Sequence, residues 1–157
     1  MNTIQIDSRE KARAIGKILN TFDENNLTYI VSKLHVGDYM QYGHPELIVD
    51  RKQHLSELAG NMCSTQVDKD GNKYNRFRDE LKEAKRLGTK IVILVEDDKI
   101  NDFEDVKNWS SKFSKVKGET LYKAMKTMES ETDKYNVEFM FCKKEETGHK
   151  IIELLSL

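Results

Sequence analysis

The chain has few cysteines and prolines and no long apolar run, and these absences exclude several classes of protein. Its 157 residues include one proline and two cysteines, Cys63 and Cys142, which lie far apart. A disulfide scaffold or a cysteine zinc site needs more thiols at closer spacing, so we expect both thiols to be inert. No segment approaches the roughly eighteen unbroken apolar residues of a membrane span. The start, MNTIQIDSRE, lacks the basic and apolar regions of a signal peptide, which predicts a cytoplasmic protein.

An excess of positive charge is also missing. There are 26 lysines and arginines against 27 aspartates and glutamates, and the net charge is −1. Proteins that bind nucleic acid are usually basic, because neutralising phosphates releases counterions and strengthens binding. A DNA-binding surface would therefore have to be local, or be completed by a second subunit. The best candidate is one loop that carries Lys107, Lys112, Lys115 and Lys117.

Hydrophobic patterning predicts one α/β domain over residues 1–157. Alternating, β-branched or strongly apolar segments predict strands at residues 3–7, 27–34, 37–42, 46–52, 90–96 and 137–142. Apolar residues at helical spacing predict helices at residues 10–22, 55–62, 76–87, 118–135 and 145–155. A turn at residues 43–45 joins the third and fourth strands in a hairpin, so the expected fold is a central mixed β-sheet flanked by helices.

Two further expectations concern single segments. Residues 90–96 form the most apolar predicted strand, which we expect inside the sheet with both faces covered. Residues 64–75 are polar and contain the turn residues Asp70-Gly71-Asn72, so we expect a loop there. We find no internal repeat, low-complexity segment or linker that would divide the chain.

Two carboxylates and a lysine lie on adjacent predicted strands. Asp38 follows a glycine, and Asp50 and Lys52 stand where an apolar strand runs into three consecutive charges. Carboxylate oxygens are preferred ligands of hard cations such as Mg²⁺. A lysine two residues after the second carboxylate points to the same face, where it could orient or deprotonate a metal-bound water. The set predicts metal-dependent phosphodiester hydrolysis, although its spacing also fits a solvated hairpin with surface ion pairs.

Other polar and aromatic residues have competing interpretations. Asp7 ends the first predicted strand and Glu10 follows one helical turn later, which also suits an acidic helix start. His35 lies next to the candidate site, where it could contact a phosphate, but strand-edge histidines are usually structural. Trp109 and Phe113 could stack on bases, and we expect them instead to pack against the domain.

Four motifs in order resemble the nuclease domain of the XPF family of structure-specific endonucleases, which includes Hef and the Mus-type enzymes. The family pattern is a D-x-R-E-like start, a G-D, an E-R-K and an R-F-x-E/Q-like helix. The chain supplies Asp7-Ser8-Arg9-Glu10, Gly37-Asp38-Tyr39, Val49-Asp50-Arg51-Lys52 and Arg76-Phe77-Arg78-Asp79-Glu80. The resemblance covers essentially the whole chain and implies a restriction-endonuclease-like nuclease fold.

The resemblance implies roles for the acidic residues and the lysine. Asp38 and Asp50 would hold Mg²⁺ or Mn²⁺, with Asp7 nearby in the acidic cluster. Lys52 would act on the nucleophilic water, and the role of Glu10 stays open. Positively charged residues would contact DNA, and we expect this of Arg9, Arg51, Arg76, Lys112, Lys115 and Lys117. Arg51 and Arg76 could instead hold the acidic side chains in position.

The chain departs from the family pattern in three places. Asp50 replaces the glutamate of E-R-K and is one methylene shorter. The family often has an aspartate where this chain has Ser56, and Glu57 follows as a substitute. Many relatives carry helix-hairpin-helix modules after the nuclease domain, whereas we expect only the nuclease domain here. Stand-alone versions of this size resemble nucleases of bacterial viruses and prophages, which suggests a bacterial or infected host cell.

These observations predict a divalent-metal-dependent DNA endonuclease that forms a homodimer and cuts branched DNA such as flaps, forks or junctions. The branched substrate follows from the family resemblance alone. One alternative is a catalytically degenerate nuclease fold that binds DNA or recruits a partner; the replacement of glutamate by Asp50 is the feature that allows it. Another is a site-specific restriction-type endonuclease that uses the same acidic residues and lysine.

Overall fold

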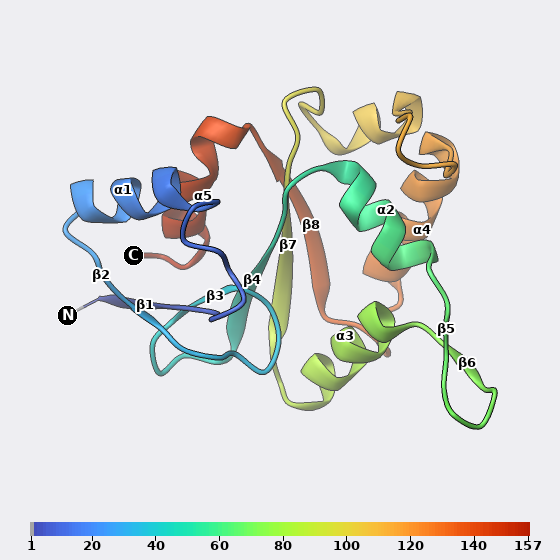
Figure 1. Cartoon of the computed structure of the whole chain (residues 1–157), viewed down its shortest axis with the longest axis horizontal. Coiled ribbons are helices and arrows are strands. Elements are labelled where there is room, and N and C mark those ends of the chain that lie inside the picture. The colour runs from blue at the N-terminus through green and yellow to red at the C-terminus, as the bar shows by residue number, and fades with distance from the viewer. Residues whose placement is uncertain (1) are drawn as a thin grey trace.

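A six-stranded mixed sheet runs through the computed structural model, which describes residues 2–157 (Figure 1). The strands lie in the order β2-β1-β3-β4-β7-β8. Their bounds are Thr3–Ile6 for β1, Thr28–Val31 for β2, Tyr39–Gln41 for β3, Leu47–Lys52 for β4, Lys90–Glu96 for β7 and Val137–Cys142 for β8. β3 is antiparallel to both β1 and β4, and every other pair is parallel. The predicted mixed α/β sheet is therefore confirmed.

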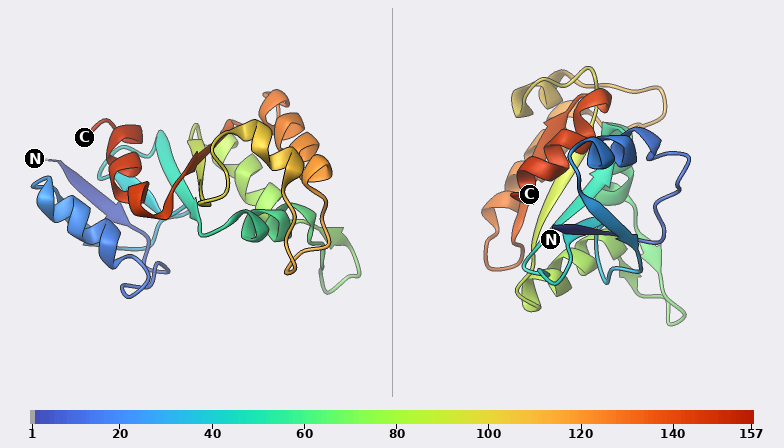
Figure 2. Two further views of the ribbon diagram at one scale, coloured as in Figure 1. Left: turned by 90° about the horizontal axis from the view of Figure 1, so that it is seen from above. Right: turned by 90° about the vertical axis from the view of Figure 1, so that its left-hand side faces the viewer.

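Helices cover both faces of this sheet (Figures 1 and 2). One face carries α1 (Gly16–Glu24) and α5 (Thr147–Leu154). The other carries α2 (Leu55–Cys63), α3 (Arg76–Arg86), α4 (Gly118–Ser130) and the 3-10 helix η1 (Phe103–Asn108). A second, three-residue 3-10 helix, η2 (Lys144–Glu146), leads into α5. None of the helices in residues 2–157 is long and apolar enough to cross a membrane.

The apolar core is divided between the two faces. Ile48 on β4 and Ile93 on β7 belong to the cluster under α2, α3 and α4, whereas Val49 and Leu94 belong to the cluster under α1 and α5. Neighbouring residues thus point to opposite faces, as the period of two in a strand requires. Every residue of β7 after the first is buried, which confirms that the apolar strand lies inside the sheet.

Two predicted helices are shorter than expected. The helix predicted at residues 10–22 begins only at Gly16, because the chain first turns while the Glu10 side chain bonds to Tyr39 and Arg51. The helix predicted at residues 118–135 ends at Ser130. The contacts of Glu10 join residues distant in sequence, which helical periodicity does not register.

Two connections contain structure that the sequence prediction missed. The expected loop at residues 64–75 holds a short antiparallel hairpin of β5 (Gln66–Val67) and β6 (Lys73–Tyr74). Asp68 shapes its turn, since its carboxylate accepts from the N–H groups of Asp70 and Asn72. The connection between β7 and α4 contains η1, which begins with a capping box at Asp102. Strands of two residues are too short to show a hydrophobic period.

Candidate active site

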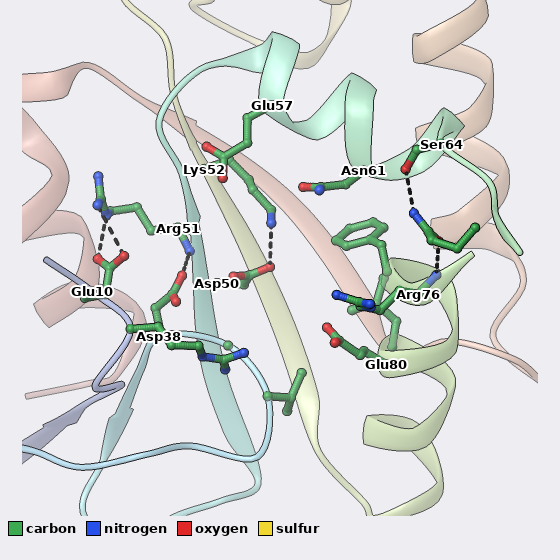
Figure 3. Close-up of a pocket in the computed structure, with 16 residues that line it drawn as sticks. Glu10, Asp38, Asp50, Arg51, Lys52, Glu57, Asn61, Ser64, Arg76 and Glu80 are labelled. Carbon is green, nitrogen blue, oxygen red and sulfur yellow. Dashed lines mark hydrogen bonds and ion pairs between the residues drawn. The ribbon is translucent and has the colours of Figure 1, made fainter. Parts of the chain in front are cut away.

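A glycine lets Asp38 approach β4 closely. Gly37 has a φ of +70°, and a Cβ atom there would clash with the side chain of Ile48. The next N–H, that of Asp38, donates to the carbonyl of Val49 at 2.9 Å. This backbone bond fixes the start of β3 against β4, so that Asp38 and Asp50 lie on the same side of the sheet (Figure 3).

Asp38 and Asp50 form an acidic pair that shares one site. Oδ2 of Asp38 accepts the backbone N–H of Arg51 at 2.7 Å. Burial raises the pKa of Asp38 to about 9, and the nearby carboxylates of Asp50 and Glu10 add to the rise. Two adjacent carboxylates cannot both carry charge easily in a partly buried site. At neutral pH the metal-free pair therefore holds a proton, which a cation can replace.

Lys52 lies beside this pair. Its Nζ is 3.4 Å from Oδ2 of Asp50, and 11% of the lysine side chain is exposed. The ammonium also lies 5.2 Å from the centre of the Phe77 ring. Burial alone would lower the pKa of Lys52, but the carboxylates of Asp50, Glu57 and Asp38 raise it overall. The side chain is therefore a protonated donor in this state rather than a free base.

Arg51 points away from the acidic pair, into a buried network. Its guanidinium donates to Glu10 at 2.8 Å and pairs closely with Glu96, and 4% of the side chain is exposed. The Tyr39 hydroxyl also donates to Glu10, at 2.7 Å, and the Thr147 hydroxyl donates to Glu96, at 2.9 Å. Burial alone would lower the pKa of Arg51, but the two carboxylates raise it overall. Of the two roles considered for Arg51, this geometry suits the fixing of acidic residues.

Asp7 touches Asp38 through the backbone, since its N–H donates to the Asp38 carbonyl at 2.8 Å, but its carboxylate bonds to other partners. It is fully buried. Oδ1 accepts the N–H of Leu34 at 2.8 Å, and Oδ2 accepts Nε of Arg9 at 2.6 Å and its backbone N–H at 3.1 Å. Burial alone would raise the pKa of Asp7, but these hydrogen bonds lower it overall. Both oxygens are therefore engaged by protein donors.

A cavity of about 390 Å³ opens between the β3–β4 hairpin and helices α2 and α3 (Figure 3). The structure brings most of the predicted site residues to its walls: Arg9, Glu10, Asp38, Asp50, Arg51, Lys52, Glu57 and Arg76. Of these, Glu57 accepts the N–H of Gln53 at 2.8 Å, just before α2, and the N-cap of that helix is His54, whose side chain accepts the N–H of Glu57. The cavity thus combines an acidic centre with positive groups, Arg9 and Arg76, at its sides.

Other predicted residues lie outside this cavity. His35 is exposed and lines an adjoining hollow with Arg76. Lys112, Lys115 and Lys117 are exposed on the loop that precedes α4. Trp109 packs against the main core cluster, as expected. Phe113 does not: it is 81% exposed, so the expectation that it packs is wrong.

Four residues at or behind the cavity were not predicted as functional: Asn61, Gln66, Glu80 and Glu96. The first three line the cavity. Within residues 2–157, Oδ1 of Asn61 is the buried side-chain nitrogen or oxygen atom that has no hydrogen-bond partner. Glu80 belongs to the R-F-x-E/Q-like motif, and Glu96 directly follows the apolar core of β7. The places of Glu80 in the motif and of Glu96 at the end of the apolar strand are the features of the sequence that could have indicated a role.

The donor set fits a hard divalent cation. Asp38 and Asp50 offer carboxylate oxygens, which Mg²⁺ and Mn²⁺ prefer, and water completes such a shell when few protein ligands are present. The raised pKa of Asp38 shows that the Lys52 ammonium beside Asp50 does not fully offset the burial and the charge of the two carboxylates. Among residues 2–157, no group of three or more acidic, histidine or cysteine side chains is arranged around one metal position. A cation here would therefore be held by two carboxylates.

The mixed sheet, the carboxylate pair and the lysine on β4 define a nuclease-type α/β domain. The ERCC4 domain matches residues 6–154, and the chain belongs to this family of nuclease domains. No curated protein matches the chain.

Solved structures show the same fold. XPF from Aeropyrum pernix has a TM-score of 0.66 and 17% identity, over 98% of this chain and 63% of that one. The same protein in complex with DNA has a TM-score of 0.67 and 20% identity, over 99% of this chain and 64% of that one. The chain therefore spans less than two thirds of the archaeal protein in these structures.

Proposed function

We propose that this domain is a divalent-metal-dependent DNA endonuclease that hydrolyses phosphodiester bonds. The observation that carries the proposal is the pair of Asp38 and Asp50 with Lys52 beside it, in one open cavity. Its support is the membership in the ERCC4-domain family.

Asp38 and Asp50 would hold the cation, Mg²⁺ or Mn²⁺. When bound, such an ion activates water and stabilises the negative charge that develops on the phosphate. The backbone N–H of Arg51 keeps Asp38 oriented. The Lys52 ammonium donates toward the attacking water or toward the phosphate oxygens, where charge grows in the transition state. No covalent intermediate is required, because water is the nucleophile.

Two arginines at the sides of the cavity would contact the DNA backbone. Arg9 and Arg76 are both exposed and line the cavity, and guanidinium groups bind phosphates in a forked geometry. Lys112, Lys115 and Lys117 would contact phosphates farther along. Binding should depend strongly on salt, because it rests on local charge in a chain with a net charge of −1.

Three residues receive supporting roles. Asp7 would orient Arg9, to which it is bonded, rather than bind the cation directly. Glu57 would hold the chain before α2 through its bond to Gln53, and its charge would help to keep Lys52 protonated. His35, in the adjoining hollow, would be at most a peripheral phosphate contact.

The substrate that best suits the family is branched DNA, and a homodimer would place two sites on one such substrate. The Aeropyrum pernix protein has been solved with DNA, which supports DNA as the ligand here. We place the activity in the cytoplasm of a bacterial or infected host cell.

A panel of end-labelled linear, flap, fork and four-way-junction DNAs tests the proposal, each incubated with Mg²⁺, Mn²⁺ or EDTA. Metal-dependent cutting of the branched members is the expected result. Cutting of linear duplex at one defined sequence would instead favour a restriction-type enzyme. Binding without any cutting would indicate a degenerate module, in which Asp50 no longer supports catalysis.

A further inference from the structure

Phe113 is the most exposed large apolar residue in the described part of the chain. It is 81% exposed, whereas the others lie between 40% and 61%: Ile30, Val31, Tyr42, Val67 and Leu87. An aromatic ring offers a large flat surface that gains from being covered. A ring left this open is therefore a candidate contact surface.

An ordered turn presents this ring. The N–H of Ser114 donates to the carbonyl of Ser111 at 3.3 Å, and these two residues form a β-bridge. The N–H of Phe113 donates to Oγ of Ser111 at 3.1 Å. At the base of the loop, Trp109 and Val116 pack against the core. The ring thus stands at the tip of a turn whose backbone is fixed on both sides.

Positive charge surrounds the tip. Residues 106–118 include Lys107, Lys112, Lys115 and Lys117 and no acidic residue. Nζ of Lys112 lies 5.2 Å from the centre of the Phe113 ring. Lys107 pairs with a glutamate, but within residues 2–157 the other three lysines form no ion pair. Their charge is available to a ligand.

The place of this loop relative to the cavity can be followed through the β5–β6 hairpin. In both views of Figure 2, the loop between η1 and α4 extends from the same side as the β5–β6 hairpin. Gln66, at the base of that hairpin, lines the cavity with Asp38 and Asp50. DNA bound along this side of the molecule would run past the loop that carries Phe113.

We propose that Phe113 stacks on a DNA base that is free of its duplex, while Lys112, Lys115 and Lys117 contact the phosphates beside it. This inference rests on the proposed function and names the feature of the substrate that Phe113 would recognise: an unpaired base, as at a fork or flap. Every base offers a flat face for stacking, and the phosphates on either side supply the opposite charge. An apolar protein surface would match the ring but leave the three lysines without counter-charge.

Binding in EDTA tests this without requiring cleavage. The probe is a fork that carries 2-aminopurine in its single strand next to the branch, compared with a linear duplex of equal length. The wild type should change the fluorescence of the probe. Phe113→Ala should abolish that change and weaken fork binding about 5- to 150-fold, the usual range for loss of one stacked base. Linear-duplex binding should be unaffected.

Two variants act as controls. Phe113→Trp keeps a stacking ring and should preserve fork binding. Leu87→Ala removes another exposed apolar side chain, at the end of α3, and should change nothing. Replacing Lys112, Lys115 and Lys117 by glutamine should reduce the salt dependence of binding for both DNAs.

Three outcomes would overturn the proposal: unchanged fork binding by Phe113→Ala, an equal loss for fork and linear duplex, or conversion of a dimer to a monomer by that substitution. The last would make Phe113 a protein contact. A wild type that stacks on the probe but cuts no DNA with Mg²⁺ or Mn²⁺ would overturn the nuclease activity and leave the stacking intact.

Discussion

The backbone N–H of Arg51 donates to the carboxylate of Asp38 at 2.7 Å, while the Arg51 side chain pairs with Glu10 and Glu96 behind the sheet. One residue of β4 therefore fixes the Asp38 carboxylate of the acidic pair with its backbone and joins two other acidic side chains with its guanidinium. Both are consequences of strand geometry, because the backbone lies in the sheet while side chains alternate between its faces. Arg51 thus links Asp38, which lines the cavity, to the network around Glu96.

The raised pKa of Asp38 predicts that metal affinity depends on pH. Because its folded-state pKa is about 9, against 3.8 for the free residue, the metal-free folded protein binds this proton more tightly than the unfolded chain does. The stability from this group is complete below the unfolded pKa and is lost as pH rises toward 9. A cation competes with the proton, so affinity should rise by up to about tenfold per pH unit and level off above 9.

Calorimetric measurement of the Tm shift caused by Mn²⁺ at several pH values tests this dependence. The shift should grow between about pH 6 and 9, where the proton is displaced. Asp38→Asn, which has no proton to release, should show a small and constant shift. An equal shift at every pH for the wild type would contradict the assignment.

Substitution of Asp50 separates catalysis from folding. Asp50→Ala should abolish cleavage and change the free energy of unfolding little, since it removes both the repulsion between the two carboxylates and the ion pair with Lys52. Asp50→Glu restores the residue of the family motif and should keep metal-dependent cleavage. Urea denaturation and cleavage of a labelled fork measure the two effects. A large loss of stability without metal would show that Asp50 is structural.

Arg51 should matter mainly for stability. Arg51→Met would leave Glu10 and Glu96 buried without their partner, and breaking a buried pair in this way costs about 3–5 kcal/mol. Arg86→Met is the matched control, because its ion pair with Glu83 is largely exposed, and it should change stability little. If both variants unfold at the same urea concentration, the buried network is not a stabilising feature.

Asp7 should behave as a positioning residue. Asp7→Asn keeps one oxygen for the N–H of Leu34 but loses the charge that holds Arg9. We expect weaker DNA binding and an unchanged Kd for Mn²⁺ in titration calorimetry. A fall in Mn²⁺ affinity as large as that of Asp50→Ala would instead make Asp7 a metal ligand.

Lys52 should affect the chemical step. Lys52→Met keeps an unbranched side chain of nearly the same length but removes the ammonium, and with it the donor and the contact with the Phe77 ring. Single-turnover cleavage should therefore slow by about 100-fold or more. The Kd for DNA in EDTA should not change, because 11% of this side chain is exposed. A parallel loss of binding and cleavage would show a role in holding DNA.

The acidic pair could be predicted from the sequence because it depends on short-range structure. Asp38 and Asp50 lie on one hairpin, whose turn at residues 43–45 sets the register of β3 against β4. The same reasoning identified Lys52, since side chains two apart share a face. Alternating apolar strands between helices were likewise enough to predict the mixed α/β sheet.

Contacts between distant segments could not be predicted in this way. Glu96 reaches Arg51 only because β4 pairs with β7 in parallel, across 45 positions of sequence. Asp7 ends its strand as an active-site carboxylate would, yet it bonds to Leu34. Such outcomes depend on the pairing of strands and on which donors then lie nearby.

The most direct measurement of the central claim is single-turnover cleavage of a labelled fork by the wild type, Asp38→Asn and Asp50→Asn, with Mg²⁺, Mn²⁺ or EDTA. We expect cleavage only by the wild type and only with a divalent cation. Cleavage in EDTA, or by either asparagine variant at the wild-type rate, would contradict the claim that Asp38 and Asp50 hold a catalytic metal.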